Sequence, residues 1–140
     1  MLSNSKKPLM LVEDDIVDQM LVKKAFAELG IKRELVILSN GEEVLTYLKS
    51  DAPQPFLIIS DINMPKMGGF ELIKEIKNDE KLGYRGKPFV ILSTVCNAFD
   101  LNEAYKNGIH GFFEKSIQYK ELVKSLGRII EYWEDCKCLE

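Results

Sequence analysis

Apolar and polar positions alternate along this 140-residue chain in a pattern that favours an α/β fold. Five short apolar runs, among them residues 9–12 and 56–59, are bounded by turn-forming or charged residues. Such runs are typical of parallel strands that are buried on both faces. The predicted strands are residues 8–13, 34–39, 56–60, 88–93 and 109–114.

Segments with helical spacing of apolar residues follow each predicted strand. Asp15 is placed to cap the first helix and Gly30 to end it, since these residue types favour those positions. The alternation of strands and helices implies a parallel sheet with right-handed crossovers and helices on both faces. The predicted helices are residues 15–29, 42–49, 70–78, 98–107 and 118–135.

Composition and charge narrow the functional classes. The content of 46% hydrophobic and 29% charged residues is ordinary for one globular domain, here residues 1–140 with a core of about 8–135. The net charge of −3 argues against charge-driven nucleic-acid binding. The longest apolar runs have four residues, so we expect no membrane span. With no secretion signal and an odd number of cysteines, we expect a cytoplasmic protein with reduced thiols.

Charged residues follow three of the predicted strands. Glu13 and Asp14 come after the first, Asp61 after the third and Lys115 after the fifth. The carboxyl ends of parallel strands meet at one edge of the sheet, where open α/β sheets bind their ligands. Crowded carboxylates repel unless a cation joins them, and hard divalent cations prefer oxygen ligands. The sequence therefore predicts a divalent-cation site beside an ammonium group.

Four segments carry a resemblance to a known family. They read LVEDD, DINMPKMGG, VILST and GFFEK, and they lie at residues 11–15, 61–69, 90–94 and 111–115. Together they resemble the receiver domain of two-component response regulators, in its single-domain, chemotaxis-regulator-like form. The resemblance covers about residues 8–135 and implies a flavodoxin-like (βα)5 doubly wound parallel sheet with strand order 2-1-3-4-5. The last helix is also similar to stand-alone receivers associated with phytochrome-type histidine kinases.

The resemblance implies an acidic site with assigned roles. Asp61 is the expected phosphoryl acceptor, since a carboxylate can form an acyl phosphate. Mg²⁺ is the expected cofactor. Its expected ligands are Glu13, Asp14, Asp61 and the backbone carbonyl of Asn63.

Further roles concern the phosphoryl group and the response to it. Lys115 is expected to pair with one phosphoryl oxygen and Ser93 to donate its hydroxyl to another. Thr94 is the neighbouring alternative to Ser93. The expected switch residues are Ser93, which moves toward the phosphoryl group, and Phe112, whose ring then turns inward. The surface of the fourth helix, fifth strand and fifth helix is expected to change.

The resemblance also implies partners. A histidine kinase or a histidine phosphotransfer protein is the expected phosphoryl donor. A downstream protein or a second copy of the chain is expected on the surface of the fourth helix, fifth strand and fifth helix, with no direct contact to nucleic acid or membrane. The protein is interpreted as a signalling receiver that catalyses only its own phosphorylation and dephosphorylation.

Some positions depart from the pattern of the family. Ser116 stands where a proline with a cis bond is usual, and a non-proline cis bond costs about 2.5–4 kcal/mol, so we expect Lys115–Ser116 to be trans. Phe112 replaces a common tyrosine and offers no hydroxyl. Val95 has no polar group to orient water, so we expect slower phosphate loss than in a Val95→Glu variant. His110 is expected to be structural.

Other functions stay open at this point. A Mg²⁺-dependent aspartyl-phosphate phosphatase or phosphotransferase usually carries a D-x-D pair on its first strand, whereas the acceptor candidate here follows the third. A flavodoxin needs a phosphate-binding loop after the first strand, where this chain has acids. A degenerate receiver used as a scaffold is opposed by the full set of acidic, hydroxyl and ammonium residues.

Overall fold

The computed structural model describes residues 7–82, 87–94 and 97–136. Its strands form one parallel sheet in the order β2-β1-β3-β4-β5, so the predicted fold class and strand order are confirmed. The strands are β1 (Leu9–Val12), β2 (Leu35–Leu38), β3 (Leu57–Ser60), β4 (Phe89–Ser93) and β5 (Gly111–Glu114). The helices are α1 (Ile16–Leu29), α2 (Gly41–Leu48), α3 (Gly69–Asn78), α4 (Ala98–Lys106) and α5 (Tyr119–Asp135), with a short 3₁₀ helix η2 (Glu80–Leu82).

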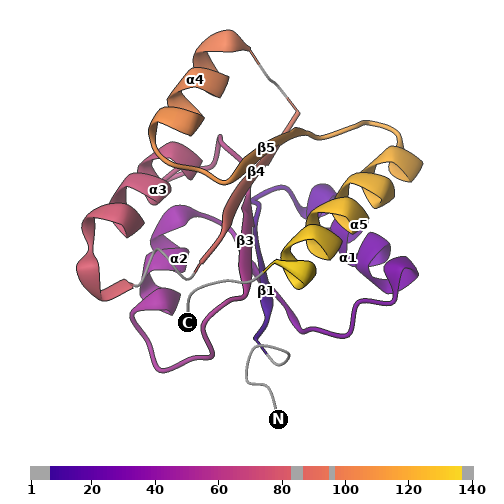
Figure 1. Ribbon diagram of the computed structural model, residues 1–140, viewed down its shortest axis with the longest axis horizontal. Coiled ribbons are helices and arrows are strands. Elements are labelled where there is room, and N and C mark those ends of the chain that lie inside the picture. Colours follow the sequence, from indigo (N-terminus) through magenta and orange to yellow (C-terminus); the bar gives the residue numbers. More distant parts are fainter. Residues whose placement is uncertain (1–6, 83–86, 95–96, 137–140) are drawn as a thin grey trace.

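Helices cover both faces of the sheet (Figure 1). Helices α1 and α5 pack against each other on one face, and α2 and α3 lie together on the other. Alternate strand residues serve the two faces, because successive side chains of a strand point in opposite directions. Leu9 and Leu11 join the core under α1 and α5, whereas Met10 and Val12 join the core under α2 and α3. The core therefore consists of two apolar layers on either side of the sheet.

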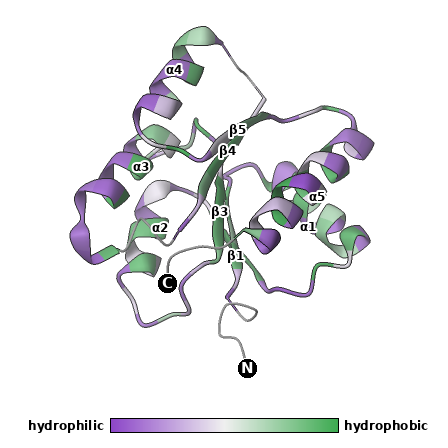
Figure 2. Cartoon of the chain, in the orientation of Figure 1, coloured by the Kyte–Doolittle hydropathy of each residue, from purple (hydrophilic) through white to green (hydrophobic). Residues whose placement is uncertain are grey.

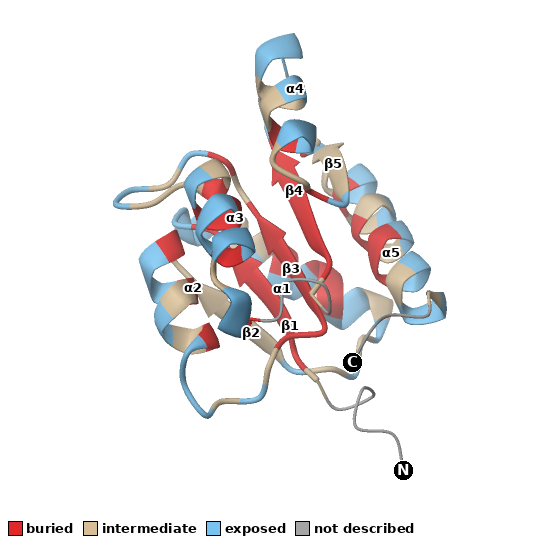
Figure 3. Cartoon of the chain, turned by 60° about the vertical axis from the view of Figure 1, so that its left-hand side comes forward, coloured by how far each residue is buried: buried red, intermediate tan, exposed pale blue. Residues whose placement is uncertain are grey.

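The apolar strands form the centre of the molecule. Figure 2 shows them mostly in green, flanked by helices that carry both polar and apolar residues. Figure 3 shows β1, β3 and β4 as buried, whereas β5 is only partly buried. All residues of β4 are buried, but no residue of β5 is, because β5 is an edge strand of the sheet. Among the described residues, no helix has the length and apolar character needed to cross a membrane.

Local side-chain bonds set the helix ends. Asp15 caps α1 by accepting the backbone N–H groups of Val17 and Asp18, and Gly30 ends this helix in the left-handed region with φ 68°. Asn40 caps α2 by accepting the backbone N–H of Glu43, so this helix begins at Gly41, one residue before its predicted start. The sequence reasoning also missed η2, whose first turn is stabilised by the Asp79 carboxylate.

Candidate functional site

Strand register brings the predicted site residues to one edge of the sheet. The backbone N–H of Asp61 donates to the Val12 carbonyl at 3.0 Å, which links the ends of β1 and β3. The backbone N–H of Lys115 donates to the Ser93 carbonyl at 2.7 Å, which links the ends of β4 and β5. The residues that follow these strands are therefore neighbours, as the sequence predicted.

Three carboxylates meet at this edge. Glu13, Asp14 and Asp61 each offer a ligand oxygen, and these oxygens all lie within 4.8 Å of one another. Glu13 is buried, Asp61 is half-buried and Asp14 is exposed, so the cluster opens to solvent on one side. Asn63 lines the same surface hollow as Asp14. A compact set of oxygen donors of this kind suits a hard divalent cation such as Mg²⁺.

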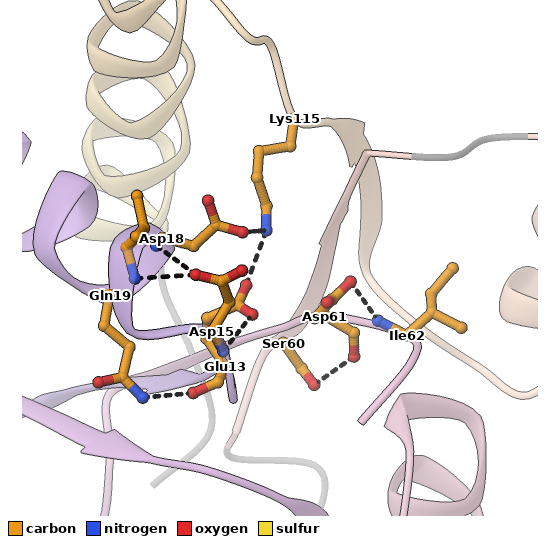
Figure 4. A network of polar contacts seen from close by, with 9 residues as sticks. Glu13, Asp15, Asp18, Gln19, Ser60, Asp61, Ile62 and Lys115 are labelled. Atoms are coloured by element: carbon orange, nitrogen blue, oxygen red, sulfur yellow. Dashed lines mark hydrogen bonds and ion pairs between the residues drawn. The ribbon is translucent and has the colours of Figure 1, made fainter. Parts of the chain in front are cut away.

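The Asp61 side chain is held by the backbone of the residue that follows it (Figure 4). Its Oδ1 accepts the backbone N–H of Ile62 at 2.8 Å. Burial raises the pKa of Asp61, and the charge of Asp14 adds to this; the Lys115 charge, the Ile62 N–H and the nearby Ser93 side chain oppose it. A raised pKa shows that the carboxylate is poorly solvated, so a cation beside it stabilises its charged form.

The loop between β3 and α3 passes close over the backbone of Asp61. A Cβ atom at Gly69 would lie 2.5 Å from the Asp61 carbonyl oxygen, and one at Gly68 would lie 2.5 Å from the Ile62 carbonyl oxygen. Both contacts are with backbone, which cannot move aside as a side chain could. The two glycines of the DINMPKMGG segment are thus required by this close approach.

Lys115 is bound to two carboxylates (Figure 4). Its Nζ lies 2.7 Å from Glu13 Oε1 and 3.1 Å from Asp18 Oδ2, and the side chain is 8% exposed. Burial alone would lower the pKa of Lys115, but Glu13, Asp18 and Asp61 outweigh it and raise the pKa. Burial raises the pKa of Glu13, although Lys115 opposes this. The ammonium therefore stays charged within the acidic cluster.

Sequence reasoning missed Asp18 and Gln19. Asp18 reaches Lys115 from the first turn of α1, and the Gln19 side-chain amide donates to the Glu13 backbone carbonyl. The Asp15 backbone N–H also donates to Glu13 Oε2 at 3.1 Å. These bonds fix the start of α1 to the end of β1. The helix dipole already explains an acid in a first helical turn, so no separate sequence signal pointed to the contact with Lys115.

The switch candidates lie at the ends of β4 and in β5. Ser93 is buried and reaches Asp61, whereas Thr94 is exposed, so the geometry favours Ser93 over Thr94. Phe112 is half-buried and packs against the core layer under α2 and α3. It also lines a cavity with Trp133 and His110.

Comparison with known proteins identifies the family. A model of the family described as "Response regulator receiver domain" matches residues 9–127. The chain belongs to the response regulator receiver family. Response regulator Rcp1 of Synechocystis is 33% identical over 136 residues, which cover 94% of this chain and 91% of Rcp1. The probable methanogenesis regulatory protein FilR2 of Methanothrix harundinacea is 32% identical, over 89% of this chain and 82% of the relative.

Solved receiver structures share the fold over nearly the whole chain. The phosphorylated cyanobacterial phytochrome response regulator RcpA matches with a TM-score of 0.87 and 32% identity, over 96% of this chain and 99% of RcpA. The Mn²⁺-bound form of Rcp1 matches with a TM-score of 0.84 and 32% identity, over the same shares of the two chains. The expected similarity to stand-alone receivers of phytochrome systems thus agrees with these relatives.

The structure also bears on the residues around which the sequence departs from the family pattern. The described residues contain no cis peptide bond, so Lys115–Ser116 is trans as predicted. His110 has the expected structural position: its Nδ1 accepts the Phe89 backbone N–H at 3.0 Å, and its ring meets the Trp133 edge. Val95 and Cys96 lie outside the described residues.

Proposed function

We propose that this receiver domain accepts a phosphoryl group on Asp61 and signals through the surface of α4, β5 and α5. The observation that supports this most is the convergence of groups around Asp61. Two further carboxylates lie within 4.8 Å, and the Ser93 side chain and the Lys115 charge both lower the pKa of Asp61. The groups come from the ends of four strands, β1, β3, β4 and β5, so the constellation depends on the whole sheet.

The proposed reaction is an in-line phosphoryl transfer. A carboxylate oxygen of Asp61 attacks the phosphorus of a phosphohistidine; the P–N bond breaks, and the histidine nitrogen leaves with the electron pair. Lys115 and Ser93 donate hydrogen bonds to phosphoryl oxygens, whose charge they help to offset. Glu13, Asp14, Asp61 and the Asn63 carbonyl would hold Mg²⁺, which when bound neutralises phosphoryl charge. Positioning and charge are thus the protein's main contributions.

The surface beside the site supports a protein as phosphoryl donor. Ile16, Val17 and Met20 are 68%, 64% and 63% exposed at the start of α1, although all three are apolar. Ile117 is 98% exposed and follows Lys115 by two residues. Exposed apolar residues that cluster near a site are typical of protein contacts. We propose that a histidine kinase or a histidine phosphotransfer protein covers them during transfer.

The proposed response starts at Ser93. A phosphoryl group adds about −1.5 to −2 charges, which attracts the Ser93 hydroxyl and the Lys115 ammonium. Movement of Ser93 would leave room on the β4 side for the ring of Phe112, which lies on the adjacent strand. Phe99, Tyr105 and Tyr132 are exposed on α4 and α5 and offer an apolar docking surface for a downstream protein or a second copy. The protein is then a signalling device that catalyses only changes to its own phosphorylation.

The test is incubation with acetyl phosphate and Mg²⁺, followed by measurement of the intact mass. We expect one added phosphoryl group in the natural protein and none in Asp61→Asn. Asp51→Asn is the matched control, because Asp51 is an exposed aspartate in a loop. Phosphoryl addition that persists in Asp61→Asn contradicts the proposed acceptor. Steady turnover of a free phosphomonoester would instead favour the phosphatase alternative.

A further inference from the structure

The second carboxylate partner of Lys115 has no place in the reaction described above. Asp18 Oδ2 lies 3.1 Å from Lys115 Nζ, while Glu13 Oε1 lies 2.7 Å from the same nitrogen. Glu13 belongs to the acidic cluster around Asp61, but Asp18 comes from α1 and is absent from that cluster. Figure 4 shows the Lys115 ammonium reaching toward Glu13 and Asp18, with Asp18 to its left and Asp61 to its right. Asp18 therefore holds the ammonium from the side facing away from the acceptor.

Asp18 is itself fixed in place. Its backbone N–H donates to Oδ1 of the capping residue Asp15 at 3.2 Å, and its side chain is 30% exposed. The Asp15 backbone N–H in turn donates to Glu13. The end of β1 and the first turn of α1 thus form one hydrogen-bonded unit with Lys115. The backbone of Asp18 is therefore fixed, and its short side chain reaches Lys115 from a set position.

The number of donors on Lys115 creates a competition. An ammonium group has three N–H bonds, and in the unphosphorylated protein Glu13 and Asp18 take two of them. The third N–H is left for a phosphoryl oxygen on Asp61, and the two ion pairs fix the direction in which it points. Attraction by Asp18 opposes any movement of the ammonium toward that oxygen.

We infer that Asp18 is a positioning residue that restrains Lys115 on the α1 side and so slows phosphoryl transfer to Asp61. This inference rests on the proposed function, since it concerns the same reaction. The restraint sets how fast a donor phosphorylates the protein. It also links the reaction to α1, the element with the exposed apolar residues Ile16, Val17 and Met20. A donor that shifts the first turn of α1 would weaken the restraint at the moment of transfer.

The first test compares rate constants of phosphorylation by acetyl phosphate at Mg²⁺ concentrations that saturate each variant. In this reaction the Asp61 oxygen bonds to phosphorus and acetate leaves with the electron pair. We expect Asp18→Asn to raise the rate constant about two- to fivefold, which is the range for loss of a partly exposed ion pair. Asp18→Glu keeps the charge and should stay close to the natural protein. A rate constant in Asp18→Asn that is unchanged or lower overturns the inference.

Two controls separate the restraint from a general change in charge or fold. Glu75→Gln removes one exposed negative charge from α3, outside the hollow lined by Asp14 and Asn63, and should not raise the rate constant. In a Lys115→Gln background, Asp18→Asn should have no effect, because the restraint acts only through the ammonium. A gain of the same size in that background would show that Asp18 acts by another route, and the inference would then be wrong.

A second measurement needs neither Mg²⁺ nor phosphorylation. Spectra of ¹⁵N-lysine-labelled, metal-free protein should contain a slowly exchanging ammonium signal that is absent in Lys115→Gln. We expect Asp18→Asn to raise its proton exchange rate by about the same two- to fivefold factor. If the natural protein takes no phosphoryl group on Asp61, the proposed function fails, yet this exchange rate still tests the Asp18–Lys115 contact. An exchange rate that does not change in Asp18→Asn overturns the inference by itself.

Discussion

The two helices on either side of β5 are anchored very differently. Helix α5 buries four large aliphatic residues, whereas α4 buries only Ala104 among the residues described for it. The buried residues of α5 are Leu122, Leu126, Ile129 and Ile130. Burial of each large aliphatic side chain stabilises by about 1.5–3 kcal/mol, so α5 is held far more strongly. The side of β5 that carries α5 is thus a firmly packed frame, whereas the side that carries α4 is packed more loosely.

The candidate site lies on the boundary between these two regions. Lys115 is tied to α1, which packs against α5, and so belongs to the frame. Ser93 ends β4 on the side where the chain continues toward α4. A phosphoryl group on Asp61 would therefore contact a firmly held ammonium and a hydroxyl next to the loosely held helix. Phosphoryl transfer would thus rely on the side of α1 and α5, and the movement that follows would take place on the side of α4.

The largest expected effect is on stability. Leu126→Ala should lower the free energy of unfolding by about 2–5 kcal/mol, because Leu126 is fully buried in the core layer under α1 and α5. Tyr105→Ala on α4 should change it by less than about 1 kcal/mol, since Tyr105 is 53% exposed. Urea unfolding of the two variants measures both values. Equal losses would mean that α4 is anchored as firmly as α5.

Hydrogen exchange should show the same contrast in the natural protein. Amide protons in α4 should exchange on the order of a hundredfold faster than those in the middle of α5, because regions with few buried apolar contacts open more easily. Mass spectrometry of peptides from the two helices measures this ratio. Similar protection in both helices would contradict the division into frame and responsive region.

Surface variants should separate the proposed donor-binding surface on α1 from the proposed docking surface on α4. Met20→Asp on α1 should slow phosphoryl transfer from a protein donor about tenfold, the loss expected when a contact worth about 1.4 kcal/mol is removed. Its rate with acetyl phosphate should not change. Phe99→Asp on α4 is the matched control, because Phe99 is 62% exposed and Met20 is 63% exposed. Slower protein-to-protein transfer in Phe99→Asp would show that the donor also covers α4.

The smallest expected effect concerns His110, the one histidine of the chain. Burial lowers its pKa below the ordinary value of 6.5. As pH falls below 6.5, the unfolded chain takes up a proton before the folded protein does, so stability decreases until pH falls below the folded pKa. Proton NMR of the imidazole gives the folded pKa directly. A value at or above 6.5 would show that the ring is not withdrawn from water.

Much of the fold and the central site could be predicted because they depend on local pattern. Asp61 and Lys115 follow short apolar runs, and parallel strands bring such residues to one edge. Asp18 could not be predicted, because its contact joins α1 to the end of β5 across 97 residues of sequence. The spacing of apolar residues also predicted α4 as a helix but not how little of it is buried. Burial depends on how neighbouring elements pack, which a local pattern does not contain.

The backbone bond between Ser93 and Lys115 has a consequence for timing. The Lys115 N–H donates to the Ser93 carbonyl at 2.7 Å. The two residues proposed to bind the phosphoryl oxygens are therefore joined by a backbone hydrogen bond. A backbone displacement of either residue pulls on the other through this bond. Activation should then follow a single exponential in rapid-mixing experiments, without a half-switched species that has engaged the hydroxyl but not the ammonium.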